Sequence, residues 1–257
     1  MRQSAVAAGL AVVALAAAGC RSDKPSAGTT PSPQVSTVST TPTVTPTKPA
    51  HKKKVVHFTS SVDLTPKAAA FTYRTAAVTA ADLGKSWHAG CPVGPALLRA
   101  VTMTYWGFDN TPHLGVLVVN RSVVPAVVTA FKTIYAARFP IRRMQPIAAY
   151  GGDDNRSMAA DNTSAFNCRR AVSNGPPSWS MHAYGEAIDI NTLENPYRLN
   201  GKVLPPAGAP YMDRENVRRG MIVAGSSPVA AFDAVHWGWG GNWSSTPDYQ
   251  HFSVNGR

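Results

Sequence analysis

Two short segments in the last third of the sequence contain the residue types of a metal-dependent hydrolytic site. In the first, His182 lies seven residues before Asp189, and in the second, Asp248 lies three residues before His251. Two neutral imidazoles and one carboxylate make a zinc site with an open fourth position. A further carboxylate beside such a site can act as a general base. We therefore expect His182, Asp189 and His251 to bind one zinc ion and Asp248 to accept the proton of the attacking water.

The backbone between His182 and Asp189 must turn if both side chains are to reach one point. Residues 187–191 alternate as a strand, with two isoleucines on the core face and Asp189 on the other face. In one uninterrupted strand, a residue seven positions earlier would lie on the opposite face. Gly185 could supply the turn or bulge that brings the two side chains together. We accordingly expect residues 179–191 to form a pair of neighbouring strands.

The second pair of residues shows the same alternation. In residues 250–254, Phe252 and Val254 are expected to face the core, and His251 the site. His236 is an alternative to His251 as a ligand, because an aspartate also lies three residues before it. No alternating strand follows His236, and His251 is therefore the preferred candidate.

A cation near the site would stabilise the charge that develops on an attacked carbonyl group. Arg169 is the first candidate, since it ends an extended segment that is predicted to pair with the strand of His182. Arg156, in the preceding loop, is the second. Each site residue alone has a simpler explanation, such as a surface histidine or a capping aspartate. The hypothesis rests on their combination.

The remaining pattern favours a loop-rich fold of mixed secondary structure. The sequence has 20 glycines and 21 prolines among 257 residues, and only 15% of the residues are charged. Ser122 is a candidate N-cap for a helix whose apolar residues keep helical spacing. The predicted elements are strands at 101–108, 113–120, 144–150 and 250–254, an extended segment at 164–169, a polar loop at 151–162, and helices at 124–138 and 227–234.

The N-terminal residues have the form of a secretion signal. A short basic start precedes an apolar run at residues 5–18 that is too short to span a bilayer. Small residues then lead into Cys20, as at a bacterial lipoprotein cleavage site. We expect residues 1–19 to be removed and Cys20 to be lipidated. Ordinary signal cleavage without a lipid is the alternative.

The chain after this signal divides by composition. Residues 20–57 are rich in Ser, Thr and Pro, and the sequence predicts a disordered linker because such a segment cannot bury enough apolar surface. A lead-in segment at 58–84 and a catalytic domain at 85–257 follow. The linker would hold that domain away from a membrane and within the cell wall.

The net charge of the chain bears on its binding partners. The formal net charge is +11, but no run of Lys and Arg interleaved with aromatic residues points to nucleic acid. For an exported protein, anionic wall polymers and lipid headgroups are nearer partners.

Cys91 and Cys168 could form a disulfide in an oxidising compartment, although two separate thiols remain an alternative. A bridge there would brace the segment that presents Arg169, besides stapling a loop-rich domain.

At these motifs the sequence resembles the zinc D-alanyl-D-alanine carboxypeptidase family. That family also includes D-Ala-D-Ala dipeptidases and phage L-alanyl-D-glutamate endopeptidases. The resemblance covers roughly residues 85–254 and rests on Ser180-x-His182-x-x-Gly185-x-Ala187-x-Asp189, Asp248-x-x-His251, and the segments 90–94, 139–144, 162–169 and 195–197.

The resemblance implies a small α+β fold with a central antiparallel sheet, flanking helices, long loops and a zinc site on the sheet face. It implies that His182, Asp189 and His251 bind one zinc, that Asp248 is the general base, and that Ser180 contacts the substrate or supports a ligand. Many members have Glu where Asp248 stands, and the shorter acid occurs in the endopeptidase-like branch. The family's substrate-polarising arginine usually precedes the first zinc histidine by a longer interval than Arg169 does.

These features together predict an exported, lipid-anchored, monomeric zinc peptidase that acts on peptidoglycan stem peptides outside the bacterial membrane. A carboxypeptidase and an L-alanyl-D-glutamate endopeptidase both fit the residues. A wall-binding lipoprotein of the same fold without turnover, and an enzyme that processes other peptides, are the competing hypotheses.

Overall fold

The structure, a computed structural model, describes residues 70–172 and 176–257. The predicted signal at 1–19, the lipidation site Cys20, the linker at 20–57 and the first part of the lead-in segment lie outside the described residues, and these stay predictions. Within the described ranges, no helix has the length and apolar character needed to cross a membrane. The mixture of helices and small, mainly antiparallel sheets confirms the predicted α+β class.

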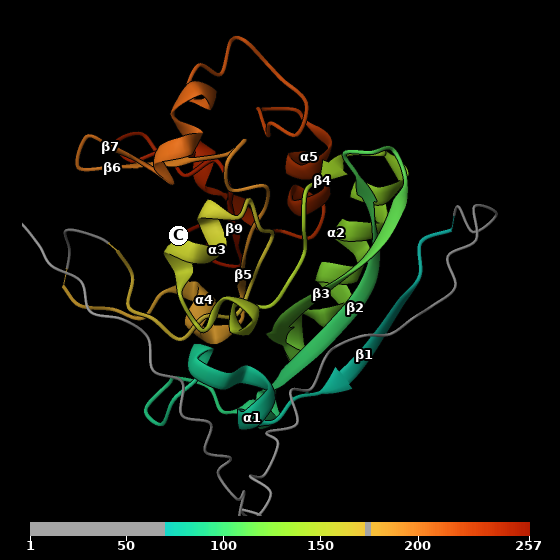
Figure 1. Ribbon diagram of the computed structural model, residues 1–257, viewed down its shortest axis with the longest axis vertical. Helices are drawn as coiled ribbons and strands as arrows, with labels where there is room; N and C mark the ends of the chain where they lie inside the picture. Colours follow the sequence, from blue (N-terminus) through green and yellow to red (C-terminus); the bar gives the residue numbers. More distant parts are fainter. Residues whose placement is uncertain (1–69, 173–175) are drawn as a thin grey trace, which may run out of the picture. The chain divides into compact units, whose positions relative to one another are not determined.

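The larger sheet is built around a long hairpin (Figure 1). Strands β2 (Leu98–Gly107) and β3 (Pro112–Asn120) pair antiparallel, which confirms the two strands predicted there. Strand β1 (Tyr73–Ala77) pairs with the other edge of β2, so part of the predicted lead-in segment belongs to the sheet. A short strand, β4 (Pro140–Ile141), pairs parallel with the far end of β2.

Both faces of this hairpin are buried, as its alternating side chains require. One face packs with helix α2 (Val124–Ala136), which runs along the hairpin, and with helix α5 (Ser227–Asp233) beside it (Figure 1). Phe131 of α2 meets Phe232 of α5 edge to face, with ring centroids 6.2 Å apart. The predictions of these two helices are confirmed. Ser122, however, does not cap α2: it lies in a preceding 3₁₀ turn whose cap is Asn120.

The smaller sheet has the order β5-β9-β8. Its strands are β5 (Ala187–Asp189), β9 (His251–Ser253) and β8 (Gly238–Trp239), all antiparallel to their neighbours. Ile188 and Phe252 point into the core that the sheet shares with α2 and α5. The predicted strand at 250–254 is confirmed, but Val254 is 40% exposed and does not face the core, because the chain turns away after Ser253.

Two predicted segments before the site are wrong. Residues 144–150 do not form a strand: Met144 makes one bridge to Thr163, and a 3₁₀ helix follows from Ile147, because Pro146 cannot donate to a sheet. The predicted polar loop at 151–162 contains helix α3 (Asp154–Ala159). Asp153 caps that helix by accepting a hydrogen bond from the Arg156 amide at 3.1 Å.

The predicted strand pair at 179–191 is also wrong in its first half. Residues Met181–Tyr184 form helix α4, and only β5 is a strand. The remaining elements are short. Strands β6 (Tyr197–Leu199) and β7 (Lys202–Leu204) form a hairpin. The other short elements are the helix α1 (Ala80–Leu83) and the 3₁₀ helices η1 (Gly84–Ser86), η2 (Pro95–Leu97), η3 (Arg121–Val123), η4 (Ile147–Tyr150), η5 (Pro206–Tyr211) and η6 (Gly240–Asn242).

Candidate metal centre and active site

Asp189 and His251 face each other because strands β5 and β9 pair in a register that makes them direct partners. Their neighbours in the strands, Ile188 and Phe252, are fully buried on the core side. Alternation therefore directs the carboxylate and the imidazole to the opposite side, as the sequence predicts. Asp189 Oδ1 lies 3.1 Å from His251 Nδ1.

His182 reaches the same point from helix α4 rather than from a strand. Ser180 caps this helix by accepting a hydrogen bond from the His182 amide, and Gly185 ends it with a left-handed φ of 71°. A Cβ atom on Gly185 would lie 2.6 Å from the Asn120 amide nitrogen, and that amide donates to the Gly185 carbonyl. Only glycine thus fits where the short helix is fixed against the end of β3.

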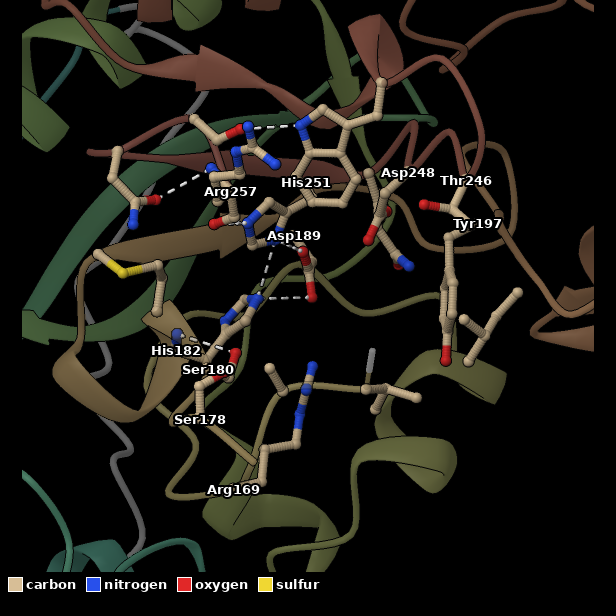
Figure 2. Close-up of a pocket in the computed structure, with 18 of the residues that line it drawn as sticks. Arg169, Ser178, Ser180, His182, Asp189, Tyr197, Thr246, Asp248, His251 and Arg257 are labelled. Carbon is tan, nitrogen blue, oxygen red and sulfur yellow. Dashed lines mark hydrogen bonds and ion pairs between the residues drawn. The ribbon is translucent and has the colours of Figure 1, made fainter. Parts of the chain in front are cut away.

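Three side-chain atoms converge in the resulting cluster (Figure 2). His182 Nε2 lies 3.1 Å from Asp189 Oδ2 and 3.2 Å from His251 Nδ1. All three side chains are buried. The outward nitrogens contact main-chain oxygens: His182 Nδ1 that of Ala165 at 2.6 Å, and His251 Nε2 that of Arg257 at 3.2 Å.

These outer contacts fix which nitrogen of each ring is free. A main-chain oxygen can only accept a hydrogen bond, so His182 Nδ1 and His251 Nε2 must carry hydrogens. In neutral rings the two inward nitrogens then present lone pairs to each other and to the Asp189 carboxylate. Three electron-pair donors at about 3 Å repel unless a cation lies between them, and the donor set suits zinc. The three residues therefore fit the metal that the sequence predicts.

The electrostatics of Asp189 agree with a ligand role. Burial alone would raise the pKa of Asp189, but the charges and hydrogen bonds of His182 and His251 hold it far below its usual value. The carboxylate therefore stays ionised, which is the form that coordinates a metal.

Asp248 enters the site from the loop before β9. A Cβ atom on Gly240 would lie 2.6 Å from the Asp248 carbonyl oxygen, so glycine is needed where this loop crosses η6. Asp248 Oδ1 is buried without a hydrogen-bond partner among the described residues. Burial, opposed by His251 and Arg169 and reinforced by the charge of Asp189, raises the pKa of Asp248 to about 7. Such a carboxyl group can both accept and release a proton near neutral pH.

Arg169 approaches the cluster from the opposite side of the cavity, with its guanidinium group directed toward Asp189 (Figure 2). Asp154 of α3 holds it, with Arg169 Nε 2.9 Å from Asp154 Oδ2, and Asn167 donates to the other oxygen of Asp154 at 3.2 Å. Burial alone would lower the pKa of Arg169, but the carboxylates of Asp154, Asp189 and Asp248 raise it above its usual value. The side chain thus remains a cation.

A disulfide joins the neighbouring residue to another loop. Cys91 and Cys168 are bridged, with their Cα atoms 5.8 Å apart. The Cys168 amide also donates to the Ser86 carbonyl at 2.9 Å. The backbone that carries Arg169 is therefore attached at two points to the segment after α1.

The structure brings most predicted site residues together, but not all of them. Ser180 lines the same cavity as the cluster, and its observed contact is the cap of α4. Arg156 lies exposed on α3 and does not line this cavity, so the structure does not place the second cation candidate at the site. His236 is exposed after α5 and lies outside the cluster.

Sequence reasoning missed four contributors. Asp154 was assigned to a loop, although the pair Asp153-Asp154 before a helical segment is an N-terminal helix signal. Tyr197 lines the cavity and pairs through its backbone with Asp248. The carbonyl groups of Ala165 and Arg257 have no side-chain signal in the sequence.

The cluster opens into a cavity of about 1130 Å³. Figure 2 shows Arg257 on one side of the cluster and Tyr197 on the other. The lining includes charged, aromatic and small polar side chains, among them Trp179, Glu186, Arg198, Trp243 and Thr246. This volume is slightly larger than that of most small-molecule sites and can hold several residues of a peptide.

Comparison with known proteins gives one match, to a family of peptidases. Residues 174–254 match the family model described as D-alanyl-D-alanine carboxypeptidase. The matched segment contains the three cluster residues and Asp248, whereas Arg169 and Cys168 precede it. Searches of curated proteins and of solved structures found no match.

Proposed function

We propose that the protein is a zinc-dependent peptidase that hydrolyses peptide bonds in peptidoglycan stem peptides, because residues 174–254 match the family model described as D-alanyl-D-alanine carboxypeptidase. The family match supports peptidase activity on peptidoglycan. The observation that carries the zinc proposal is the convergence of His182, Asp189 and His251, with both imidazoles oriented by backbone carbonyl groups.

His182, Asp189 and His251 would hold the metal, and the fit of this donor set supports that role. When bound, zinc lowers the pKa of water to about 7 and polarises carbonyl groups. Asp248 accepts the proton of the attacking water and passes it to the leaving amine. A pKa raised to about 7 by burial suits both transfers. The positive charge of a bound ion favours the deprotonated form, from which the reaction starts.

Arg169 supplies positive charge from the other side of the cavity. Its guanidinium group would donate hydrogen bonds to the substrate carbonyl or carboxylate, where negative charge resides or develops. The ion pair with Asp154 limits the conformations of the side chain, so that less ordering is needed when substrate binds. In this role Arg169 is a catalytic residue and Asp154 a positioning residue.

The size of the cavity keeps a second bond choice open. A D-alanyl-D-alanine terminus occupies only part of about 1130 Å³. An L-alanyl-D-glutamate endopeptidase, which must bind residues on both sides of the scissile bond, would use more of this space. Identification of the products from defined muropeptides distinguishes the two.

The principal experiment compares the full chain with two variants. Metal content is measured by mass spectrometry, and each protein is incubated with muropeptides. The Asp248→Ala variant should retain zinc but release no product, whereas Asp233→Ala, at an exposed position on α5, should behave like the unmodified protein. Equal release by the Asp248→Ala variant would refute its role as a base. Zinc-loaded protein that binds stem peptides without releasing any product would support the wall-binding alternative.

The location of the protein is part of the same proposal and rests on the sequence alone. A lipid on Cys20 would anchor the protein at the outer face of the membrane, and the linker at 20–57 would carry the domain into the wall. A Cys20→Ala variant expressed in a bacterial host should move from the membrane fraction to the medium. Retention of the variant in the membrane would contradict lipid anchoring.

A further inference from the structure

Residues 255–257, here called the return segment, fold back from the end of β9 toward the cluster. The Gly256 amide donates to the Ser253 carbonyl at 3.2 Å, with Gly256 at a positive φ of 71°. The Arg257 amide donates to the Asn255 side-chain oxygen at 2.9 Å. These bonds form a tight turn that directs the backbone of Arg257 to the site.

Strand β8 and the loop after η6 hold the return segment in place by two further contacts. Trp243 Nε1 donates to the Gly256 carbonyl at 2.8 Å. On β8, a Cβ atom added to Gly238 would lie 2.5 Å from the Gly256 Cα, which is closer than two such atoms can approach. Gly238 therefore leaves the space that the return segment occupies.

The result is a backbone acceptor placed on a ligand ring. The Arg257 main-chain oxygen accepts from Ser253 Oγ at 2.9 Å and lies 3.2 Å from His251 Nε2. His182 obtains its acceptor, the Ala165 carbonyl, from the extended segment beside β5, which is tied into the sheet. His251 has only the return segment for this purpose among the described residues.

We propose that the return segment is a positioning element of the metal site, which keeps the hydrogen of His251 on Nε2 and leaves Nδ1 free as a ligand. The inference rests on the proposed zinc site. Without the Arg257 main-chain oxygen, the hydrogen can move to Nδ1 and be donated to Asp189 Oδ1, 3.1 Å away. The ligand nitrogen would then be blocked and the ring less well oriented. Loss of such an outer contact lowers metal affinity by about 10–100-fold.

Zinc affinity of the full chain, measured by competition with a chromophoric chelator, tests this proposal. Deletion of residues 255–257 should weaken zinc binding about 10–100-fold. Arg257→Ala is the matched control: it removes the side chain but keeps the main-chain oxygen, so zinc affinity should stay unchanged. Gly238→Ala, which displaces the segment without shortening the chain, should weaken binding in the same direction as the deletion. Unchanged affinity in both the deletion and Gly238→Ala would overturn the proposal, as would an equal loss in Arg257→Ala.

A second measurement does not depend on zinc. Nitrogen-15 NMR of the metal-free protein, at a pH where His251 is neutral, reports which ring nitrogen carries the hydrogen. The Nε2–H form is expected in the full chain and in Arg257→Ala, and a shift toward Nδ1–H in the deletion. Identical His251 spectra in the full chain and the deletion would overturn the inference. Failure of the unmodified chain to bind zinc would refute the proposed function, whereas this tautomer result would still decide the role of the segment.

Discussion

The two sheets of the molecule are stabilised in different ways. In the larger sheet, β2 and β3 are 10 and 9 residues long, pair along their length and bury apolar side chains on both faces. In the smaller sheet, β5 and β9 have three residues each. Strands so short cannot form a stable sheet by themselves. The smaller sheet depends on the core that it shares with α2 and α5, and on polar contacts to surrounding loops.

Those polar contacts use side chains to bind backbone groups. Asn191, directly after the β5 region, donates to the Pro140 carbonyl at 2.7 Å and accepts from the Arg142 amide at 3.0 Å. Asn195 likewise accepts from the Ile222 amide. A buried hydrogen-bond network positions groups accurately but adds little net stability. The larger sheet should therefore determine whether the chain folds, and the smaller sheet whether it binds metal and turns over substrate.

The largest effect is expected from Asp189→Asn, which keeps the shape of a ligand but removes its charge. Zinc binding and muropeptide hydrolysis should both fall to background, while the melting temperature in excess chelator should change by only a few degrees. Inductively coupled plasma mass spectrometry, product release and thermal unfolding measure the three quantities. Asp233→Asn is the matched control. An Asp189→Asn protein with full zinc content would contradict both the ligand assignment and the division between the sheets.

The opposite pattern is expected from Leu117→Ala on β3. Leu117 is fully buried in the shared core, and loss of a buried leucine side chain costs about 2–5 kcal/mol of unfolding free energy. The protein that remains folded should bind zinc with unchanged affinity. Urea unfolding in chelator, together with zinc competition at low temperature, tests this. A loss of zinc affinity parallel to the loss of stability would show that the two sheets do not act separately.

The same difference explains what the sequence could predict. The hairpin of β2 and β3 and helix α2 were predictable because their apolar periodicity extends over many residues. Helix α4 was not, since four residues carry no period and the helix is determined by its Ser180 cap and by Gly185. Helix α3 was missed for the same reason, although Asp153 is a capping residue.

For the site, too, the sequence predicts the features that follow from local patterns and not those that depend on tertiary packing. Alternation placed Asp189 and His251 on the side away from the core, and residue chemistry suggested His182 and Asp248. The register that makes Asp189 and His251 partners, and the carbonyl groups that orient both imidazoles, follow from tertiary packing. A main-chain oxygen carries no side-chain signature, so no sequence pattern identifies those of Ala165 and Arg257 as the acceptors.

A smaller effect is expected from Asp154→Asn, which weakens the hold on Arg169 without touching the metal cluster. The variant should lose about 10-fold in kcat/KM, because Arg169 then samples more conformations, whereas Arg169→Ala should lose about 100–1000-fold. Zinc affinity should remain unchanged in both.

The double variant separates a positioning role from an independent one. If Asp154 acts through Arg169, adding Asp154→Asn to Arg169→Ala should cost little further activity. A second 10-fold loss in the double variant would mean that Asp154 contributes in another way, for example through its hydrogen bond with Asn167.

The smallest effect concerns stability and pH, at a carboxyl group in the polar network next to the smaller sheet. Glu194 is almost fully buried, and burial together with the neighbouring Asp161 raises the pKa of Glu194 to about 8. Arg142 lies 3.6 Å away but is half exposed, so its opposing effect is screened. Between the ordinary pKa of a glutamate and pH 8, the folded protein therefore holds a proton on Glu194 that the unfolded chain has released. The folded state is favoured by this group at low pH and loses that advantage as pH rises through this range.

The Glu194→Gln variant, whose side chain stays neutral, should flatten the dependence of the unfolding free energy on pH. It should be more stable than the unmodified protein at pH 9 by about 1 kcal/mol. Unfolding in urea across the range from pH 5 to 9, in chelator, measures the difference, with the exposed Glu215→Gln as control. If Glu194→Gln instead destabilises the protein equally at both ends of the range, the carboxyl group acts as an ionised partner of Arg142, and the smaller sheet depends on an ion pair rather than on neutral hydrogen bonds.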